Sequence, residues 1–430
     1  MLSKTKILLI GSMLMLFSSF LHAETSTSKD RFSADVSSIN LRDAINKTFE
    51  HNPTLKSFNY QLKAQQALQL QASMAASPEL AFIVEDVLGT GNFNGVKKAQ
   101  ATLSISWVVE GNIRQGYKDE ARANTLSFAS EANIKRLDAA AETARLYLVC
   151  LANQARLINA DKTYELANET VAAVSKRVLA GKSPEAELAR AKAERARKRL
   201  DREELEHRLH STIRLLAAQW GETNPEFSSV SGDVFSLPTP LSFETLKSRI
   251  LQNPDFLRLL SDKRLKQAQL TLMEKQSKRE WRVYLGFRQI EFTNDQTLVA
   301  GIRIPFGERA RNAGNIASAR EKLSQNQALQ DGLRVRVETT LFVLSQDLQH
   351  SLHRIDAYRK QIIPLLEAAL KQTRRAYDLG RYSYLELRSV QAELLNARTA
   401  LIEDSVDAHL TVIEIERLTG VSMIKATDNK

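Results

Sequence analysis

Two pairs of histidines in this chain have a spacing that could hold a metal ion. His207 and His210 are three positions apart, and so are His350 and His353. In a helix, residues three apart lie on one face, and neutral imidazole is a common metal ligand. Two histidines alone would form at most a weak, transient binding site for a metal ion. We therefore expect solvated helix histidines and keep weak metal binding as the alternative.

No catalytic constellation accompanies these histidines. The sequence has no H-E-x-x-H zinc-protease helix, no P-loop, no paired cysteines and no G-x-S-x-G elbow. Its one cysteine, Cys150, lies between Val149 and Leu151 and is expected to be a small core residue without a disulfide partner. We expect no enzyme, no cofactor and no metal site.

The composition predicts long helices. Only 9 prolines and 16 glycines interrupt 430 residues, and Ala, Leu, Glu, Lys, Arg and Gln dominate. The net charge of +10 is interleaved with acidic residues, which is typical of solvated helices and not of a nucleic-acid-binding block. The mean hydropathy is too low for a protein built from many membrane-spanning helices. Residues 1–23, basic and then apolar up to Ala23, predict a cleaved signal peptide, and we expect no lipid anchor.

The chain contains a duplication. "VLAGKSPEAELARAKAERARKR" (178–199) matches "YDLGRYSYLELRSVQAELLNAR" (377–398), with Gly181 on Gly380 and Glu187 on Glu386. A second pair of matched segments, at an offset of 201 residues, places Asn52-Pro53 on Asn253-Pro254. A period this long means two similar halves and not a solenoid. The predicted organisation is a signal peptide (1–23), a first repeat (24–220), a linker (221–241), a second repeat (242–420) and a tail (421–430).

Each half predicts a helical hairpin with a glycine at its tip. The long helix of the first half is expected over 112–180 and that of the second over 308–379, where Pro364 should kink it. A glycine with positive φ lets the chain reverse at 181 and 380. The first helix carries apolar residues at alternating spacings of four and three, which is a heptad seam: Leu137, Ala141, Ala144, Leu148, Leu151, Ala155 and Ile158.

Four runs with period-two alternation predict strands, at 78–88, 100–109, 281–291 and 297–306. Each is about as long as a tilted strand that crosses a bilayer. One side of each run is apolar, whereas Arg282, Arg288 and Arg303 on the other side fit a wet lumen. Open strand edges are not tolerated in lipid, so the barrel must close between chains, and we infer a trimer. The alternative is a small soluble sheet that caps a coiled coil.

These segments resemble the TolC family of outer-membrane efflux channels. The resemblance covers almost the whole chain after residue 23, from "AINKTFEHNP" (44–53) to the closing "EIERLTG" (414–420). The first half also resembles the heavy-metal subgroup typified by CzcC, although "WVVEGNIRQ" (107–115) has Trp107 where that subgroup usually has glutamine.

The resemblance implies a mainly α fold with membrane β-structure. Three chains would form a 12-strand barrel in the outer membrane and a long α-helical barrel in the periplasm. The homotrimer would contact outer-membrane lipid, a periplasmic membrane-fusion (adaptor) protein and, through it, an inner-membrane pump of the RND type. The two glycine turns of each chain would be hairpin tips at the periplasmic entrance.

The resemblance also assigns residues near the tips. An acidic residue six positions after the second glycine narrows the pore in this family, which is Glu386 here. The next such position is Ser389, and Glu187 is the match in the first tip. An ordinary first-turn glutamate at a helix N-terminus is the alternative for Glu386. Adaptor contact is expected at the tips, with turn geometry alone as the alternative: Gly181, Lys182, Gly380, Arg381 and Tyr382.

The expected function is therefore a passive exit duct of a tripartite efflux system for metal cations or small toxic compounds. Export of polypeptides through a type I secretion partner is one alternative. A periplasmic coiled-coil adaptor that forms no channel is the other, and the four lipid-patterned strands argue against it.

Overall fold

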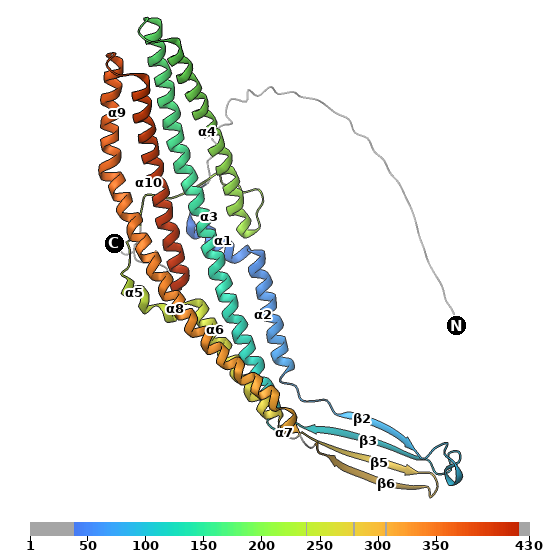
Figure 1. The fold of residues 1–430 in the computed structure, drawn as a ribbon. Coiled ribbons are helices and arrows are strands. Elements are labelled where there is room, and N and C mark those ends of the chain that lie inside the picture. Colours follow the sequence, from blue (N-terminus) through green and yellow to red (C-terminus); the bar gives the residue numbers. More distant parts are fainter. Residues whose placement is uncertain (1–37, 238, 278–279, 306–307, 421–430) are drawn as a thin grey trace, which may run out of the picture. The chain divides into compact units, whose positions relative to one another are not determined.

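The computed structural model describes residues 38–237, 239–277, 280–305 and 308–420. The predicted signal peptide (1–23) and tail (421–430) lie outside these residues. The described chain consists of long helices and a four-stranded sheet (Figure 1). The fold class predicted from the sequence is confirmed in these elements and by the comparisons given below.

The first half contains two short helices, two long strands and a helical hairpin. Its elements are β1 (Ser38–Ile39), α1 (Leu41–His51), α2 (Pro53–Gln71), β2 (Glu79–Glu85), η1 (Gly91–Phe93), β3 (Gln100–Val109), α3 (Ile113–Leu179), α4 (Glu185–Ala217) and η2 (Ala218–Trp220). The linker contributes β4 (Ser229–Val230), which pairs in parallel with β1.

The second half repeats this order with a more broken long helix. Its elements are α5 (Phe243–Ser248), η3 (Ile250–Gln252), α6 (Pro254–Gln276), β5 (Trp281–Ile290), β6 (Asp295–Arg303), α7 (Glu308–Arg311), α8 (Ala313–Ala357), the π-helical turn η4 (Tyr358–Ile362), α9 (Ile363–Asp378) and α10 (Tyr384–Thr419).

The sequence pattern predicts one long helix over 308–379. The structure divides this range into α7, α8, the π-helical turn η4 and α9, so the expectation of a single helix is wrong. Pro364 lies in the first turn of α9, directly after the π-helical turn. A proline cannot donate to the carbonyl four residues back and its ring crowds that carbonyl. A π turn changes the hydrogen-bonding register locally, and this lets helical structure continue past Pro364.

The matched Asn-Pro pairs explain why the two halves begin alike. Asn52 caps α2 by accepting a hydrogen bond from the amide of Leu55 (3.0 Å), and its own amide donates to the carbonyl of Gln219 (2.7 Å). Asn253 caps α6 in the same way and donates to the carbonyl of Leu418 (2.7 Å). Each asparagine thus ties the start of one helix to the end of the last helix of its half.

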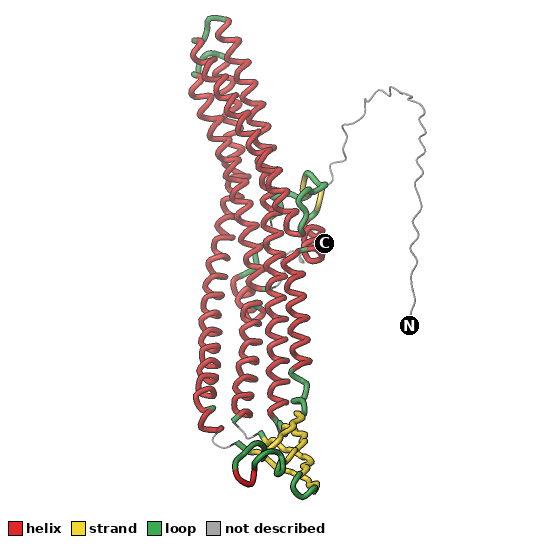
Figure 2. The backbone as a smooth tube through the Cα atoms, turned by 90° about the vertical axis from the view of Figure 1, so that its right-hand side faces the viewer, coloured by secondary structure: helices red, strands yellow, loops and turns green. Residues whose placement is uncertain are grey.

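The long helices pack side by side, as Figures 1 and 2 both show. α3 contacts α4, α6 and α10, and α10 also contacts α8 and α9. The predicted seam of α3 is at least partly buried as far as Ala155, and Leu341, Leu348 and Ile355 on α8 form one core cluster with residues of α10. Ile158 is the exception, at 57% exposed. A straight helix drifts by about 20° per heptad relative to a 3.5-residue repeat, so the seam of α3 leaves its neighbour there.

The four long strands form one antiparallel sheet in the order β2-β3-β5-β6. β2 is shorter than expected, because Asp86 (φ 60°) and Leu88 (φ 57°) adopt left-handed conformations and end the strand. β6 starts two residues earlier than expected, at Asp295, which pairs with Ile290; the last residue of that predicted run, Phe306, lies outside the described residues. Among the helices of the described chain, none is long and apolar enough to cross a membrane.

Candidate functional site: two hairpin tips and a two-faced sheet

The two hairpin tips are built by the same helix C-cap. At the first, Gly181 has φ 68°, and the amides of Gly181 and Lys182 donate to the carbonyls of Val178 (2.9 Å) and Arg177 (2.8 Å). At the second, Gly380 has φ 77°, and the amides of Gly380 and Arg381 donate to the carbonyls of Tyr377 (2.9 Å) and Ala376 (2.8 Å). Both patterns are Schellman motifs, which need a residue with positive φ at the glycine position. This shared cap is why glycine recurs in the two halves.

The helices that leave the tips start differently. α4 follows Pro184 and has no side-chain cap. α10 starts with a capping box, in which the Ser383 hydroxyl accepts from the Glu386 amide (3.3 Å) and the Glu386 carboxylate accepts from the Ser383 amide (2.6 Å) and hydroxyl (2.8 Å). The backbone hydrogen bond from Ser383, followed by the hydroxyl bond, lowers the pKa of Glu386. Glu386 is thus an exposed, charged side chain with a structural task in its own helix.

Glu187 has a different environment from Glu386, although the two align in the sequence. Glu187 is half-buried, and its Oε2 atom is buried without a hydrogen-bond partner among the described residues. Burial, with a smaller contribution from the Glu187 carboxylate, raises the pKa of both Tyr377 and Tyr384. Ser389 is exposed and donates to Glu393 (3.3 Å). Of the three predicted aperture residues, Glu386 alone presents an exposed carboxylate, and this carboxylate is hydrogen-bonded to Ser383 in the capping box.

Arg177, which sequence reasoning missed, joins the two tips. Its Nε donates to the hydroxyl of Ser183 (3.0 Å) and its Nη2 to the carbonyl of Lys182 (3.3 Å), both in the first tip. Its Nη1 donates to the carbonyl of Tyr377, at the end of α9. The aligned position in the second half is Ala376, so a break in the repeat was the available signal.

A small apolar cluster lies behind this arginine. Tyr377, Tyr384 and Leu387 of the second hairpin pack with Val174 and Ala191 of the first. Further from the tips, ion pairs with partly exposed side chains join the hairpins, among them Arg374–Glu169 (2.6 Å), Arg388–Glu194 (3.2 Å) and Arg156–Glu403 (2.8 Å). Exposed pairs contribute about 0–1 kcal/mol each. These ion pairs therefore contribute more to the specificity of the contact between the hairpins than to its stability.

The predicted adaptor-contact residues lie at the outer ends of the hairpins. Lys182, Arg381 and Tyr382 are exposed, and Tyr382 keeps 46% of its surface. Gly181 and Gly380 are exposed too. The turn accounts for the positive φ of both glycines. The side chains of Lys182, Arg381 and Tyr382 are exposed and available to a partner.

The sheet has one apolar and one charged face. Register places Leu80 beside Ile105, Leu285 and Ala300, and in the next such row Phe82 beside Leu103, Phe287 and Leu298. Nearly all of these side chains are exposed, Leu298 by 76%. An exposed apolar face of this extent marks a contact with lipid or protein.

The opposite face is polar and laced with ion pairs. Arg282 pairs with Glu79 (2.7 Å) and Arg288 with Glu85 (3.1 Å), while Arg288 also donates to Thr102 (2.9 Å). Arg303 lies directly opposite Arg282 in the register. Charged side chains on one face and exposed apolar side chains on the other match strands that separate lipid from water.

The histidine pairs are not part of a larger cluster of metal-ligating side chains among the described residues. In the part of the chain that the structure describes, no group of three or more His, Cys, Asp or Glu side chains could hold an ion. His207, His210, His350 and His353 lie on α4 and α8, as the helical spacing predicted.

Comparison with known proteins identifies similar chains. This chain is 24% identical over 351 residues to the "Cobalt-zinc-cadmium resistance protein CzcC" of Cupriavidus metallidurans, which covers 82% of each protein. Its structure is similar to that of CusC (TM-score 0.74, 16% identity, 89% of this chain and 92% of that chain). It is also similar to the outer membrane protein VceC of Vibrio cholerae (TM-score 0.73, 17% identity, 89% and 96%) and to the CmeC outer membrane channel of Campylobacter jejuni (0.68, 14%, 92% and 90%). No protein-family model matches the chain.

Proposed function

Because the resemblance to the TolC-type outer-membrane channels is confirmed by these relatives, we propose that this protein is the outer-membrane exit duct of a tripartite efflux system. The observation that carries the proposal is the two-faced sheet, which lies at the end of the long helices opposite to the hairpin tips (Figure 1). Its exposed apolar face fits lipid and its charged face fits water. An adaptor that forms no channel has no use for such a sheet.

The proposed duct is a homotrimer. The single sheet has two open edges, β2 and β6, and unpaired strand edges are not tolerated in lipid. On the polar face, Glu79 of the β2 edge and Arg303 of the β6 edge lie near the same end of the sheet and carry opposite charges, whereas Glu85 and Asp295 at the other end are both acidic. The opposite charges of Glu79 and Arg303 favour pairing of β6 in one copy with β2 in the next. Three copies supply twelve strands, a number that leaves a pore, whereas eight strands enclose an interior that side chains nearly fill.

The proposed partners meet the protein at the hairpin tips. A periplasmic adaptor contacts Lys182, Arg381 and Tyr382 around the turns at Gly181 and Gly380, and links the duct to an inner-membrane pump of the RND type. The exposed cationic and aromatic side chains at these turns support a docking role.

The proposed aperture is a ring of three Glu386 carboxylates, one from each copy, with Ser389 one turn further along α10 and Glu187 half-buried behind it. A ring of exposed carboxylates favours cations over anions. The protein performs no chemistry in this proposal: it seals, docks and opens.

The proposed cargo is divalent metal cations, with small toxic organic compounds as the second candidate. The printed name of the curated relative, a cobalt-zinc-cadmium resistance protein, favours metals. Secretion of polypeptides through a type I partner remains the alternative within the same fold, because a wide polar lumen selects little.

A growth panel tests the function. A strain that lacks this protein and its complemented parent are compared on zinc, cobalt, nickel, cadmium and copper salts, and on dyes and detergents. We expect sensitivity confined to divalent metals. If the strain that lacks the protein is sensitive to dyes and detergents but not to metals, the cargo is organic compounds and not metal cations. Recovery of the protein as a periplasmic soluble chain, and not as a heat-labile trimer in outer membranes, would contradict the duct itself.

A further inference from the structure

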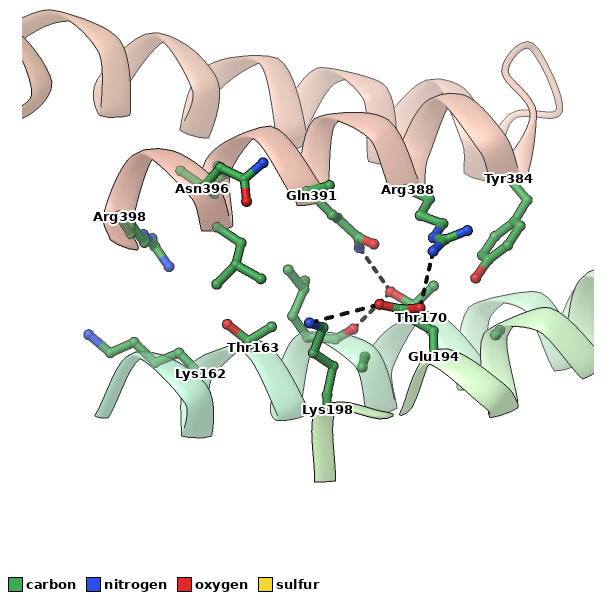
Figure 3. A pocket seen from close by; sticks show the side chains of 16 residues that line it. Lys162, Thr163, Thr170, Glu194, Lys198, Tyr384, Arg388, Gln391, Asn396 and Arg398 are labelled. Atoms are coloured by element: carbon green, nitrogen blue, oxygen red, sulfur yellow. Dashed lines mark hydrogen bonds and ion pairs between the residues drawn. The ribbon is translucent and has the colours of Figure 1, made fainter. Parts of the chain in front are cut away.

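A cleft lies between the two hairpins and extends from Tyr384, just behind the second tip, along α10. One cavity of about 220 Å³ is lined by residues of α3, α4 and α10 (Figure 3). A second cavity of about 260 Å³ shares with it Thr163, Lys198, Leu395 and Asn396. The two therefore form one continuous cleft across the hairpins. Each cavity is smaller than the about 300–1,000 Å³ of typical small-ligand pockets, so the cleft suits only a small molecule.

The lining of this cleft is amphipathic. Its apolar part comes from Leu166, Ala167, Ala191, Leu394 and Leu395. Its polar part includes Thr163 and Asn396 as possible hydrogen-bond partners, while Gln391 and Thr170 bond to each other across the cleft (2.9 Å). Apolar and polar side chains thus contribute about equally to the lining, which suits a ligand that has both an apolar body and a polar group.

The charges of the lining leave one cation without a partner. Arg388 pairs with Glu194 (3.2 Å) and Lys198 with Asp201 (3.0 Å). Lys162 has no acidic or hydrogen-bonding partner among the described residues, and it lies at the same end of the cleft as Arg398 (Figure 3). The other cationic lining residues, Arg156 and Arg398, pair with acids outside the lining: Glu403 and Glu367.

We propose that this cleft binds a small organic anion with an apolar body. Its single acidic group lies against Lys162, and its body lies on the leucine and alanine side chains. One unpaired cation beside an apolar floor fits one negative charge, because a second charge would have no partner in the cleft. The small volume fits such a molecule, whereas a helix is about 10–12 Å across and would need a longer trough.

Occupancy of the cleft would connect the two hairpins. The ligand would contact α3 and α4 of the first hairpin and α10 of the second at once. A ligand stabilises the arrangement to which it binds better, so binding would favour closely packed hairpins over separated ones. This consequence for channel opening rests on the proposed function, whereas binding itself does not.

The binding experiment compares one anionic and one cationic fluorescent probe. Each is titrated against the purified full-length protein in detergent. The probes are 1-pyrenesulfonate and a pyrene that carries a trimethylammonium group, which share an apolar body and differ in charge. We expect the sulfonate to bind at least about tenfold more tightly, because the Lys162 ammonium group attracts the sulfonate and repels the trimethylammonium group. Equal binding of the two probes would overturn the proposal, since the apolar sheet face could then account for it.

Variants locate the site. Lys162→Gln should weaken binding of the sulfonate about three- to tenfold, and Lys162→Arg should restore it. Lys322→Gln on α8 is the matched control, because Lys322 is also exposed and has no partner among the described residues. Equal losses in Lys162→Gln and Lys322→Gln would overturn the proposal in favour of general surface charge. Binding of an acidic helical peptide, lost in Lys162→Gln, without binding of the sulfonate would overturn it in favour of a partner helix.

Discussion

The guanidinium of Arg177 on α3 stacks on the ring of Tyr377 on α9, with the guanidinium carbon 4.6 Å from the ring centroid. Arg177 also donates a hydrogen bond to the carbonyl of Tyr377. The two residues come from different halves of the duplicated chain, so the contact joins the first hairpin to the second. Tyr377 is 1% exposed, and a desolvated cation–π contact contributes about 2 kcal/mol.

Removal of this contact should ease separation of the tips. In Arg177→Ala we expect longer or more frequent open states in planar bilayers, because the hydrogen bonds to Ser183, Lys182 and Tyr377 are lost together. Arg177→Lys should lie closer to alanine than to wild type, since an ammonium group cannot reproduce the planar fork. Lys176→Ala is the control, because Lys176 is exposed and lacks a partner among the described residues. An unchanged open time in Arg177→Ala would remove the contact from the opening mechanism.

The Glu386 carboxylate should make conductance depend on divalent cations. In Glu386→Gln we expect weaker block by added divalent cations, because three carboxylates are lost from the proposed aperture. Glu321→Gln on α8 is the control, because Glu321 is exposed and lies outside the hairpin tips. Block that is equal in wild type and Glu386→Gln would return Glu386 to its role as a helix cap alone.

The pH dependence of this block follows from the capping box. Hydrogen bonds from Ser383 lower the pKa of Glu386. A carboxylate with a depressed pKa stays charged as pH falls through the ordinary glutamate range and is protonated only below it. Ser383→Ala removes the hydroxyl donor, so its cation block should disappear at a higher pH than that of wild type. The same midpoint in both proteins, measured by titration of conductance, would contradict this coupling.

Much of this architecture could be predicted from the sequence because it repeats. Gly181 and Gly380 mark identical caps, and Asn52 and Asn253 mark identical helix starts. Period-two alternation placed the strands to within a few residues. It failed at Leu88, where positive φ values at Asp86 and Leu88 end β2 despite the alternating pattern.

The candidate site was less predictable, because its key contacts depend on the places where the halves differ. Arg177 contacts both tips, but its aligned residue is Ala376, so the repeat itself did not point to it and only the break in the repeat could have done so. Glu187 and Glu386 align in the sequence, yet one has a buried, unpaired oxygen and the other a capping box. Local spacing cannot report such differences, because they arise from what the neighbouring helix supplies.

The two faces of the sheet should respond oppositely to an added charge. Leu298 and Thr297 are neighbours on β6 whose side chains point to the apolar and the polar face. Leu298→Arg should reduce the yield of heat-labile trimers in outer membranes, because an arginine at the lipid midplane costs about 2–4 kcal/mol. Thr297→Arg places the same side chain on the polar face and should assemble normally. Equal yields of the two variants would contradict a lipid-facing side.

The buried asparagine at the start of α6 should matter more for stability than its counterpart at α2. Asn253 is fully buried, whereas Asn52 is 9% exposed. Asn253→Ala removes both the cap of α6 and the donor to the Leu418 carbonyl, which then stays buried without that partner. Loss of a cap costs about 1 kcal/mol and an unsatisfied buried group about 1–3 kcal/mol, so we expect a lower midpoint of thermal unfolding than in Asn52→Ala. Asn253→Asp keeps the acceptor and removes only the donor, so an unfolding midpoint equal to that of wild type would show that the bond to Leu418 does not hold the second half together.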